Sequence, residues 1–151
     1  MPTVAHGLDG LRELAGADLG PSDWLEITQE RVNAFADATG DHQWIHVDPE
    51  RARGGPFGGT IAHGYLTLAL IISLWTQILR IEEVATAVNY GLNRIRFPAP
   101  VPVGSQIRLH ARAAAVEEVP GGVQLILDFT MELRGSDKPA MVAEALFRYL
   151  A

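Results

Sequence analysis

The sequence contains no cysteine. Without thiols the chain can form no disulfide, no thiolate metal site and no cysteine nucleophile, so its chemistry must rest on oxygen and nitrogen groups. Basic residues are also few, because 12 Lys and Arg stand against 18 Asp and Glu and give a formal net charge of −6. A nucleic-acid-binding protein needs a basic face, and this charge balance argues against a nucleic-acid partner.

A targeting segment is also missing. The first residues, MPTVAHGLDGLREL, contain no basic stretch followed by an apolar run, so we expect no signal peptide and a cytoplasmic protein. Residues 61–79 carry no Lys, Arg, Asp or Glu, and a run of that length could cross a bilayer. Because several polar residues interrupt the run, we expect a core helix buried on nearly all sides, and no membrane contact.

Length and composition predict one domain. The chain has 151 residues, of which 48% are hydrophobic and 20% are charged. These values are typical of a globular protein with a single core. No internal repeat, low-complexity segment or linker divides the chain, so we expect one domain over residues 1–151.

The first half of the chain shows the start and stop residues of helices. A short helix is predicted over 8–16 and a short strand over 23–28. Thr28 is suited to cap the next helix, which Gly40 would end by allowing a left-handed turn. Asp48, followed by proline, is typical of another helix start. These residues predict short helices on either side of an irregular segment.

After residue 79 the hydrophobic period changes from helical to two. Apolar and polar residues alternate over 107–115, 123–133 and 141–149, and a further strand is predicted over 88–97. Strands of this kind form an antiparallel sheet with one wet face and one buried face. The sheet must bury its apolar face against something, so we predict an α+β fold in which the sheet wraps around one long central helix.

Ionisable residues gather in the segment GDHQWIHVD, residues 40–48. Asp41 and His46 are five residues apart, a spacing that points them to different faces of either a strand or a helix. They can meet only if the chain turns between them, which Gly40 permits. A carboxylate and an imidazole that reach one water molecule can divide the acid and base roles between them. The spacing is equally compatible with two solvated turn residues.

This segment resembles a known family. GDHQWIHVD is followed, 17 positions after His46, by His63-Gly64 at the start of the apolar run, and later by YGLNRIRFPAPVPVG at 90–104. Together they resemble the MaoC-like (R)-specific enoyl-CoA hydratases, also called hydratase 2, which have the hot-dog fold. The resemblance extends from about Trp24 to the C-terminus and is greatest to the actinobacterial and nodulation-protein-N-like branch.

The resemblance implies a reaction and roles for three residues. Asp41 and His46 match the catalytic pair that deprotonates a water molecule, which attacks C3 of a trans-2-enoyl-CoA. Syn addition then gives the (3R)-3-hydroxyacyl-CoA. Gly64 matches the residue whose backbone N–H binds the thioester carbonyl, where negative charge builds up in the transition state. The resemblance further implies a homodimer and no cofactor other than the coenzyme A of the substrate. We also expect no metal, because His42 and His46 lie four residues apart in a predicted turn and no firm third ligand follows them.

Four further residues are candidates for substrate binding: Gln43, His63, Tyr65 and Arg94. Three of them have a plainer interpretation. His63 could satisfy a buried backbone group, Tyr65 could pack in the core, and Arg94 could be an ordinary residue on the wet face of a strand. His42 and His63 also compete with His46 as the catalytic base, and we expect His42 to be an exposed loop residue.

The chain departs from the common family pattern at two places. Gln43-Trp44 stands where many members have Asn-Pro, and Ile72 stands where some members have a serine in the central helix. Two other functions remain open. One is a non-catalytic acyl-CoA-binding subunit of a hot-dog assembly. The other is an acyl-CoA thioesterase, although the carboxylate that such enzymes place on the central helix is absent from residues 61–79.

Overall fold

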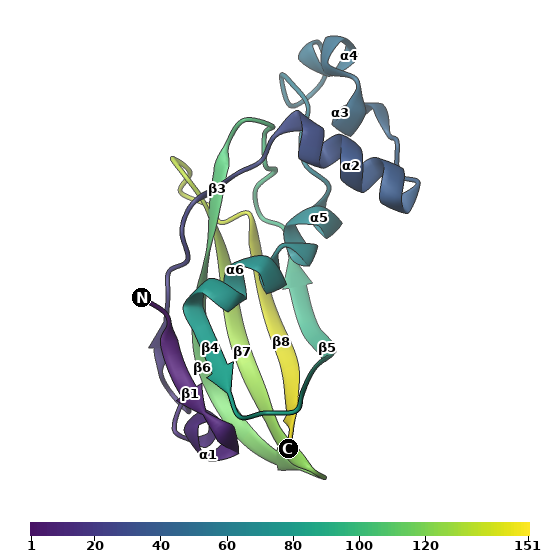
Figure 1. Ribbon diagram of the computed structural model, residues 1–151. Coiled ribbons are helices and arrows are strands. Elements are labelled where there is room, and N and C mark those ends of the chain that lie inside the picture. Colours follow the sequence, from purple (N-terminus) through teal and green to yellow (C-terminus); the bar gives the residue numbers. More distant parts are fainter.

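The computed structural model describes residues 1–151, and its main element is a six-stranded sheet. The strand order is β2-β6-β7-β8-β5, and β3 also pairs with β6 (Figure 1). All pairings within this sheet are antiparallel. The strands are β2 (Asp18–Leu19), β3 (Leu25–Glu26), β5 (Thr86–Arg96), β6 (Gln106–Val119), β7 (Gly122–Leu133) and β8 (Met141–Leu150). The three strands predicted from the period of two and the further strand predicted over 88–97 are confirmed.

The inner face of the sheet is apolar because every second residue of the long strands points inward. In β8 buried and half-buried residues alternate along the whole strand. Three inward aromatic rings pack edge-on, with the ring of Trp75 5.4 Å from Phe129 and 6.2 Å from Phe147. The indole N–H of Trp75 donates to the Tyr149 hydroxyl over 3.2 Å, so the one polar atom of this side chain is satisfied inside the core.

The central helix lies across this inner face (Figure 1). It consists of α5 (Gly64–Ala69) and α6 (Ile71–Ile78), which are separated by Leu70. The structure confirms the predicted α+β arrangement, a sheet wrapped around a helix as in a hot-dog fold. The predicted helix over 61–79 was too long, because residues 61 and 62 instead pair with the chain at 101 and 102.

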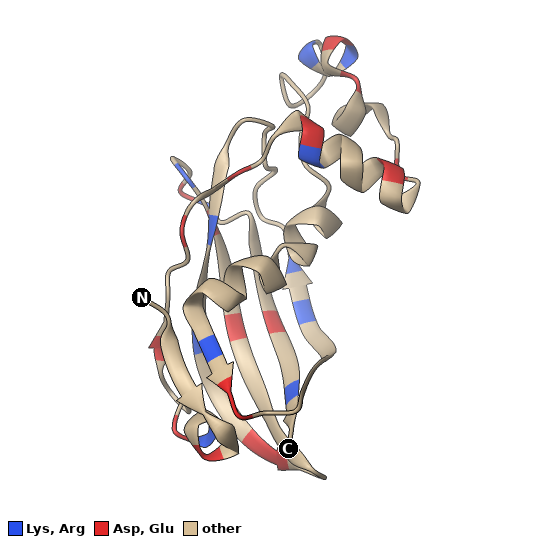
Figure 2. Ribbon diagram, in the orientation of Figure 1, with Lys and Arg blue, Asp and Glu red and all other residues tan.

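One prediction about this helix was wrong. It is not buried on nearly all sides, since Ile72 is 47% exposed and Tyr65 is 73% exposed. Ser73, Thr76 and Gln77 are exposed as well. The sheet covers only one side of the helix, and the sequence period could not show how far around it the sheet extends. Neither α5 nor α6 carries a charge (Figure 2), and no helix of the structure is long and apolar enough to cross a membrane.

Three further helices gather at one end of the sheet (Figure 1): α2 (Gln29–Thr39), α3 (Trp44–Val47) and α4 (Pro49–Arg53). The predicted caps are confirmed. The Thr28 side chain accepts a hydrogen bond from the Arg31 N–H, and Asp48 does the same for Arg51. Gly40 has φ +77° and ends α2 with the left-handed turn that glycine adopts without strain.

The N-terminal region differs most from the prediction. The first helix, α1 (Gly7–Arg12), is shorter than the predicted 8–16, and β3 has two residues where we expected a strand over 23–28. A parallel pair of strands, β1 (Thr3–His6) and β4 (Leu79–Glu82), was not predicted. Each has only four residues, which is too short for a period of two to stand out.

Candidate active site

The structure brings Asp41 and His46 together. The left-handed turn at Gly40 reverses the chain after α2, and the single turn of α3 then carries His46 back towards Asp41. His63, the residue before α5, joins them. One side-chain ligand atom from each of Asp41, His46 and His63 lies within 4.8 Å of the other two. The carboxylate and the imidazole are therefore close enough to contact the same water molecule.

The surroundings of His46 determine which ring nitrogen is free. The side chain is buried, and its Nδ1 lies 2.7 Å from the backbone oxygen of Ile61. A carbonyl oxygen only accepts hydrogen bonds, so Nδ1 carries the proton in the neutral ring. The proton position is thus assigned from the hydrogen-bond partner. Nε2 is left with its lone pair, which is the state a general base requires.

Asp41 is exposed, and its carboxylate is only loosely held. Its Oδ1 accepts a hydrogen bond from the backbone N–H of Gln43 over 3.4 Å. No side chain in the structure donates to this carboxylate or forms an ion pair with it. An ionised carboxylate has about four acceptor positions, so most of them remain available to water or substrate.

His63 supports both members of the pair. Its ring stacks on His46 with 3.8 Å between the ring centroids, and its Nε2 lies 3.0 Å from the backbone oxygen of Asp41. The side chain is 2% exposed, and its Nδ1 has no hydrogen-bond partner. Burial lowers the pKa of His63 below the ordinary histidine value. His63 thus contacts a partly buried backbone carbonyl, and it also lies within the cluster.

Asp41, His46 and His63 are of the residue types that bind transition metals. From the sequence we saw no third ligand beside the histidines, and the structure supplies a group of three. One nitrogen of each ring already contacts a backbone carbonyl, which leaves His46 Nε2 and His63 Nδ1. The expectation of a metal-free site stays a prediction.

The burial of His63 leads to a prediction for the pH dependence of stability. Its pKa is lower in the folded chain than in the unfolded chain, so the unfolded state binds more protons once the pH falls below about 6.5. The free energy of unfolding should therefore decrease as the pH falls through this range. Urea titrations between pH 8 and pH 5 should show a shallower decrease for His63→Gln than for the wild type. Parallel pH curves for the two proteins would contradict this role of His63.

The backbone N–H of Gly64 has no hydrogen-bond partner within the protein. Gly64 is the first residue of α5, and its N–H and that of Tyr65 take part in no backbone hydrogen bond. Because α5 has only six residues, the free N–H groups matter here more than a helix dipole. A Cβ at Gly64 would lie 3.1 Å from the Phe97 ring, so the glycine lets this ring pack closely against the helix start.

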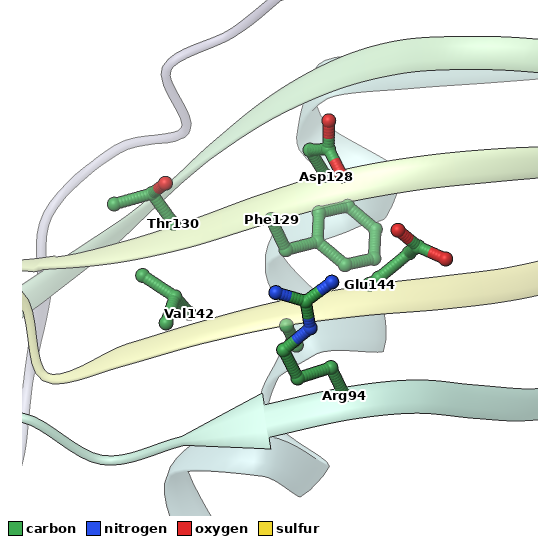
Figure 3. Close-up of a pocket in the computed structure, with 7 residues that line it drawn as sticks. Arg94, Asp128, Phe129, Thr130, Val142 and Glu144 are labelled. Atoms are coloured by element: carbon green, nitrogen blue, oxygen red, sulfur yellow. The ribbon is translucent and has the colours of Figure 1, made fainter.

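The other predicted binding residues lie in different places. Gln43 is exposed and contacts Asp41 through its backbone N–H rather than its side-chain amide. Tyr65 lines an apolar pocket beside the central helix. Arg94 lies on the outer face of the sheet, where it extends across β8 towards Glu144 and Asp128 (Figure 3). The structure does not bring Arg94 to the cluster of Asp41, His46 and His63.

His42 is exposed, as predicted, and its Nε2 lies 2.8 Å from Asp37 on α2. Two contributions to the site were missed in the sequence. The backbone oxygen of Ile61 sets the protonation of His46, and the side chain of Gln29 contacts the backbone of His46. Neither residue type stands out at its position, because both act through local geometry that residue spacing does not reveal.

Two apolar pockets lie along the central helix. The nearer has a volume of about 260 Å³ and is lined by Tyr65, Leu68 and Leu92 among others. The farther has a volume of about 380 Å³ and lies between α6, β4 and β5. Ile72, Asn89 and Phe147 line both pockets. The two pockets therefore adjoin, and we refer to them together as the apolar groove. The nearer pocket includes Tyr65, the residue after Gly64.

Comparison with known proteins gives consistent results. The sequence pattern described as "MaoC like domain" matches residues 12–124. The chain is 58% identical over 142 residues to "3-hydroxyacyl-thioester dehydratase Z" of Mycobacterium tuberculosis. This match covers 93% of this chain and 94% of that protein. It is 43% identical over 133 residues to "Nodulation protein N" of Rhizobium leguminosarum bv. viciae, covering 85% and 81%.

Among solved structures, the fold is similar to that of R-hydratase PhaJ1 from Pseudomonas aeruginosa. The TM-score is 0.74 at 22% sequence identity, and the match covers 90% of this chain and 81% of that chain.

Proposed function

The chain belongs to the MaoC-like dehydratase family and is an enzyme of that family, and from this premise we propose that it is an (R)-specific enoyl-CoA hydratase. It catalyses the reversible syn addition of water to a trans-2-enoyl-CoA to give the (3R)-3-hydroxyacyl-CoA. The dehydratase named among its relatives corresponds to the reverse direction of the same reaction. The observation that carries the proposal is the closeness of Asp41 and His46 beside the free N–H of Gly64.

The geometry supports the following sequence of events. A water molecule is held between the carboxylate of Asp41 and Nε2 of His46. Nε2 takes a proton while the water oxygen bonds to C3, and the C2–C3 π electrons move towards the thioester. The negative charge that develops on the thioester oxygen is stabilised by the N–H of Gly64. A proton then returns from the Asp41–His46 pair to C2 on the same face, which completes the addition.

No metal takes part in this proposal. The base is a neutral imidazole whose proton position is already set by Ile61, and the charge on the thioester oxygen is met by a backbone N–H. Coenzyme A enters only as part of the substrate. The departures at Gln43 and Ile72 leave the pair intact, because Gln43 contacts Asp41 through its backbone and Ile72 lies on the exposed side of α6.

The test is an assay with stereochemical analysis. Purified protein is supplied with crotonyl-CoA, loss of the enoyl absorbance is followed, and the product is analysed with (3R)- and (3S)-specific dehydrogenases. We expect turnover that yields only the (3R) product. Binding without turnover would instead indicate a non-catalytic acyl-CoA-binding subunit, and release of free coenzyme A would indicate a thioesterase.

The apolar groove is proposed to hold the acyl chain. It begins beside Gly64, where the thioester would bind, and Ile72 lies at the junction of its two pockets. A larger side chain at this junction should block the farther pocket and leave the nearer one open. We expect Ile72→Trp to raise KM for a C8 or longer enoyl-CoA about tenfold while changing KM for crotonyl-CoA less than twofold. Equal changes for both substrates would contradict this placement of the chain.

We also propose that two copies of the chain form a homodimer through β5. This eleven-residue strand is at the edge of the sheet, so its outer backbone groups are unpaired. Exposed apolar side chains surround it, including Val88, Tyr90 and Phe97, together with Tyr65 and Ile72 from the helix. Phe97 also contacts Gly64, so a partner on this edge would cover the open side of the site.

Sedimentation at micromolar concentration tests the homodimer. We expect twice the chain mass of 16.4 kDa. The variant Val88→Lys should shift the equilibrium towards the monomer, because it places a charge in the apolar interface. Val4→Lys is a matched control, since Val4 is equally exposed but lies on β1. A monomeric wild type, or equal dissociation of both variants, would overturn this assembly.

A further inference from the structure

Gln29 makes an unusual set of contacts behind the site. It is the first residue of α2 and is half-buried. Its Nε2 donates to the backbone oxygen of His46 over 2.7 Å, and its Oε1 accepts from the hydroxyl of Thr60 over 2.6 Å. The remaining proton of Nε2 faces Oδ1 of Asn33 at 2.9 Å. Both ends of the amide are therefore used, and a reversed amide would place its oxygen against a carbonyl oxygen.

These contacts close a ring around the imidazole of His46. Thr60 directly precedes Ile61, whose backbone oxygen accepts from His46 Nδ1 and whose N–H donates to Ile45. One side of the ring is thus the direct contact between His46 and Ile61. The other side runs from the His46 carbonyl through the Gln29 amide to the Thr60 hydroxyl. Gln29 thus links the segment that carries His46 to the segment that carries Thr60 and Ile61, and the imidazole of His46 bridges the same two segments.

This ring of contacts is attached to the sheet on two sides. Ile27, two residues before Gln29, is fully buried and exchanges backbone hydrogen bonds with Gly104 and Ser105, which directly precede β6. On the other side, the Thr60 carbonyl accepts from the N–H of Val103. The amide therefore connects His46 to parts of the backbone that are fixed by the core.

We propose that Gln29, together with Thr60, is a positioning residue for the reaction, which fixes the orientation and the Nδ1-protonated state of His46. The expected kinetic effect rests on the proposed function. The geometry of the ring of contacts is independent of it. Gln29 contacts neither the substrate nor the reacting atoms, so it acts through His46. Misplacement of a catalytic group affects the transition state more than substrate binding, and the expected result is a loss in kcat rather than a rise in KM.

The first test is kinetic. Gln29→Met keeps the length of the side chain but removes both hydrogen-bonding groups. We expect kcat for crotonyl-CoA to fall roughly 30-fold, with KM within threefold of the wild type. Gln77→Met is the matched control, because Gln77 is an exposed glutamine on α6 that lies outside the site, and it should keep kcat within twofold.

Thr60 supplies the second arm, which also serves if Gln29→Met folds poorly. Thr60→Val removes the hydroxyl at nearly constant volume and should lower kcat about fivefold, while Thr60→Ser should restore it to within twofold. The double variant Gln29→Met/Thr60→Val should be no slower than Gln29→Met alone, because both changes break the same ring. Assays are run well below the Tm of each variant. Unchanged kcat in Gln29→Met, or a loss confined to KM, would overturn the proposal.

A third measurement does not depend on activity. Nitrogen-15 NMR of the histidine side chains distinguishes the two neutral tautomers. We expect His46 to be protonated on Nδ1 in the wild type and in Gln77→Met, and to show a mixture of tautomers in Gln29→Met. If the wild type lacks hydratase activity but the tautomer changes as expected, the proposed function fails while the positioning role stands. An unchanged tautomer in Gln29→Met would refute the positioning role whatever the activity.

Discussion

Replacement of Asp41 by Asn, or of His46 by Gln, is expected to lower kcat for enoyl-CoA hydration by roughly 10³-fold, or about 4 kcal/mol in the transition state. Each change keeps the size of the side chain and removes the group that accepts or transfers a proton. The two groups would act on one water molecule, since they lie within 4.8 Å of each other. KM should change little, because neither group lines the apolar groove.

The same reasoning gives a control and a combined variant. His42→Gln alters a histidine next to Asp41 that is exposed and faces Asp37, so kcat should stay within twofold of the wild type. The double variant Asp41→Asn/His46→Gln should be about as slow as either single variant, because groups that act as a unit lose their effect together. Circular dichroism and thermal unfolding would establish whether each variant is folded. Near-normal turnover by either single variant would show that a different group carries out the proton transfer.

Replacement of Gly64 by Pro is expected to lower kcat a further 10² to 10³-fold relative to Gly64→Ala, about 3–4 kcal/mol. Proline is the one residue that removes the backbone N–H proposed to bind the thioester oxygen. The first position of a helix accepts proline, and His63 before it already has φ −63° and ψ 139°, which a following proline requires. The helix start should therefore persist while its free N–H is lost.

Gly64→Ala serves as the control because it adds the same Cβ and keeps the N–H. That Cβ would lie 3.1 Å from the Phe97 ring, which must then shift by a few tenths of an ångström. We expect the alanine variant to lose less than about tenfold in kcat. Equal losses in the alanine and proline variants would mean that space at Gly64, rather than its N–H, is what the reaction needs.

Most of the fold could be predicted from the sequence because its strands are long. The alternation in 107–115, 123–133 and 141–149 identifies strands and their inner faces, and caps such as Thr28 and Gly40 set the ends of α2. The β1–β4 pair could not be predicted, since parallel pairing of two four-residue strands depends on where the chain arrives after α6. The exposed side of α6 was missed for a related reason, because an uncharged run indicates apolar surroundings without showing what supplies them.

The candidate site was predicted in its residue types but not in its geometry. The spacing of Asp41 and His46 allowed either convergence or two solvated turn residues, and only the turn at Gly40 and the brief α3 decide between these. His63 belongs to the cluster because the chain returns to α2 after residues 54–59, a segment with four glycines, and no local pattern indicates this return. Arg94 was a candidate for substrate binding or an ordinary residue on the wet face of a strand, and the strand register places it on the outer face beside Glu144.

The helices α2, α3 and α4 gather beyond one end of the sheet, so the proposed proton-transfer groups and the proposed acyl-chain groove come from different stretches of sequence. Asp41, His46 and His63 all precede α5, whereas the groove is formed by α5, α6 and the strands that follow. Reactivity and substrate range can therefore diverge independently during evolution. A chimaera that joins residues 1–63 of this chain to the corresponding later part of a relative should keep the same chemistry and acquire the chain-length preference of the relative.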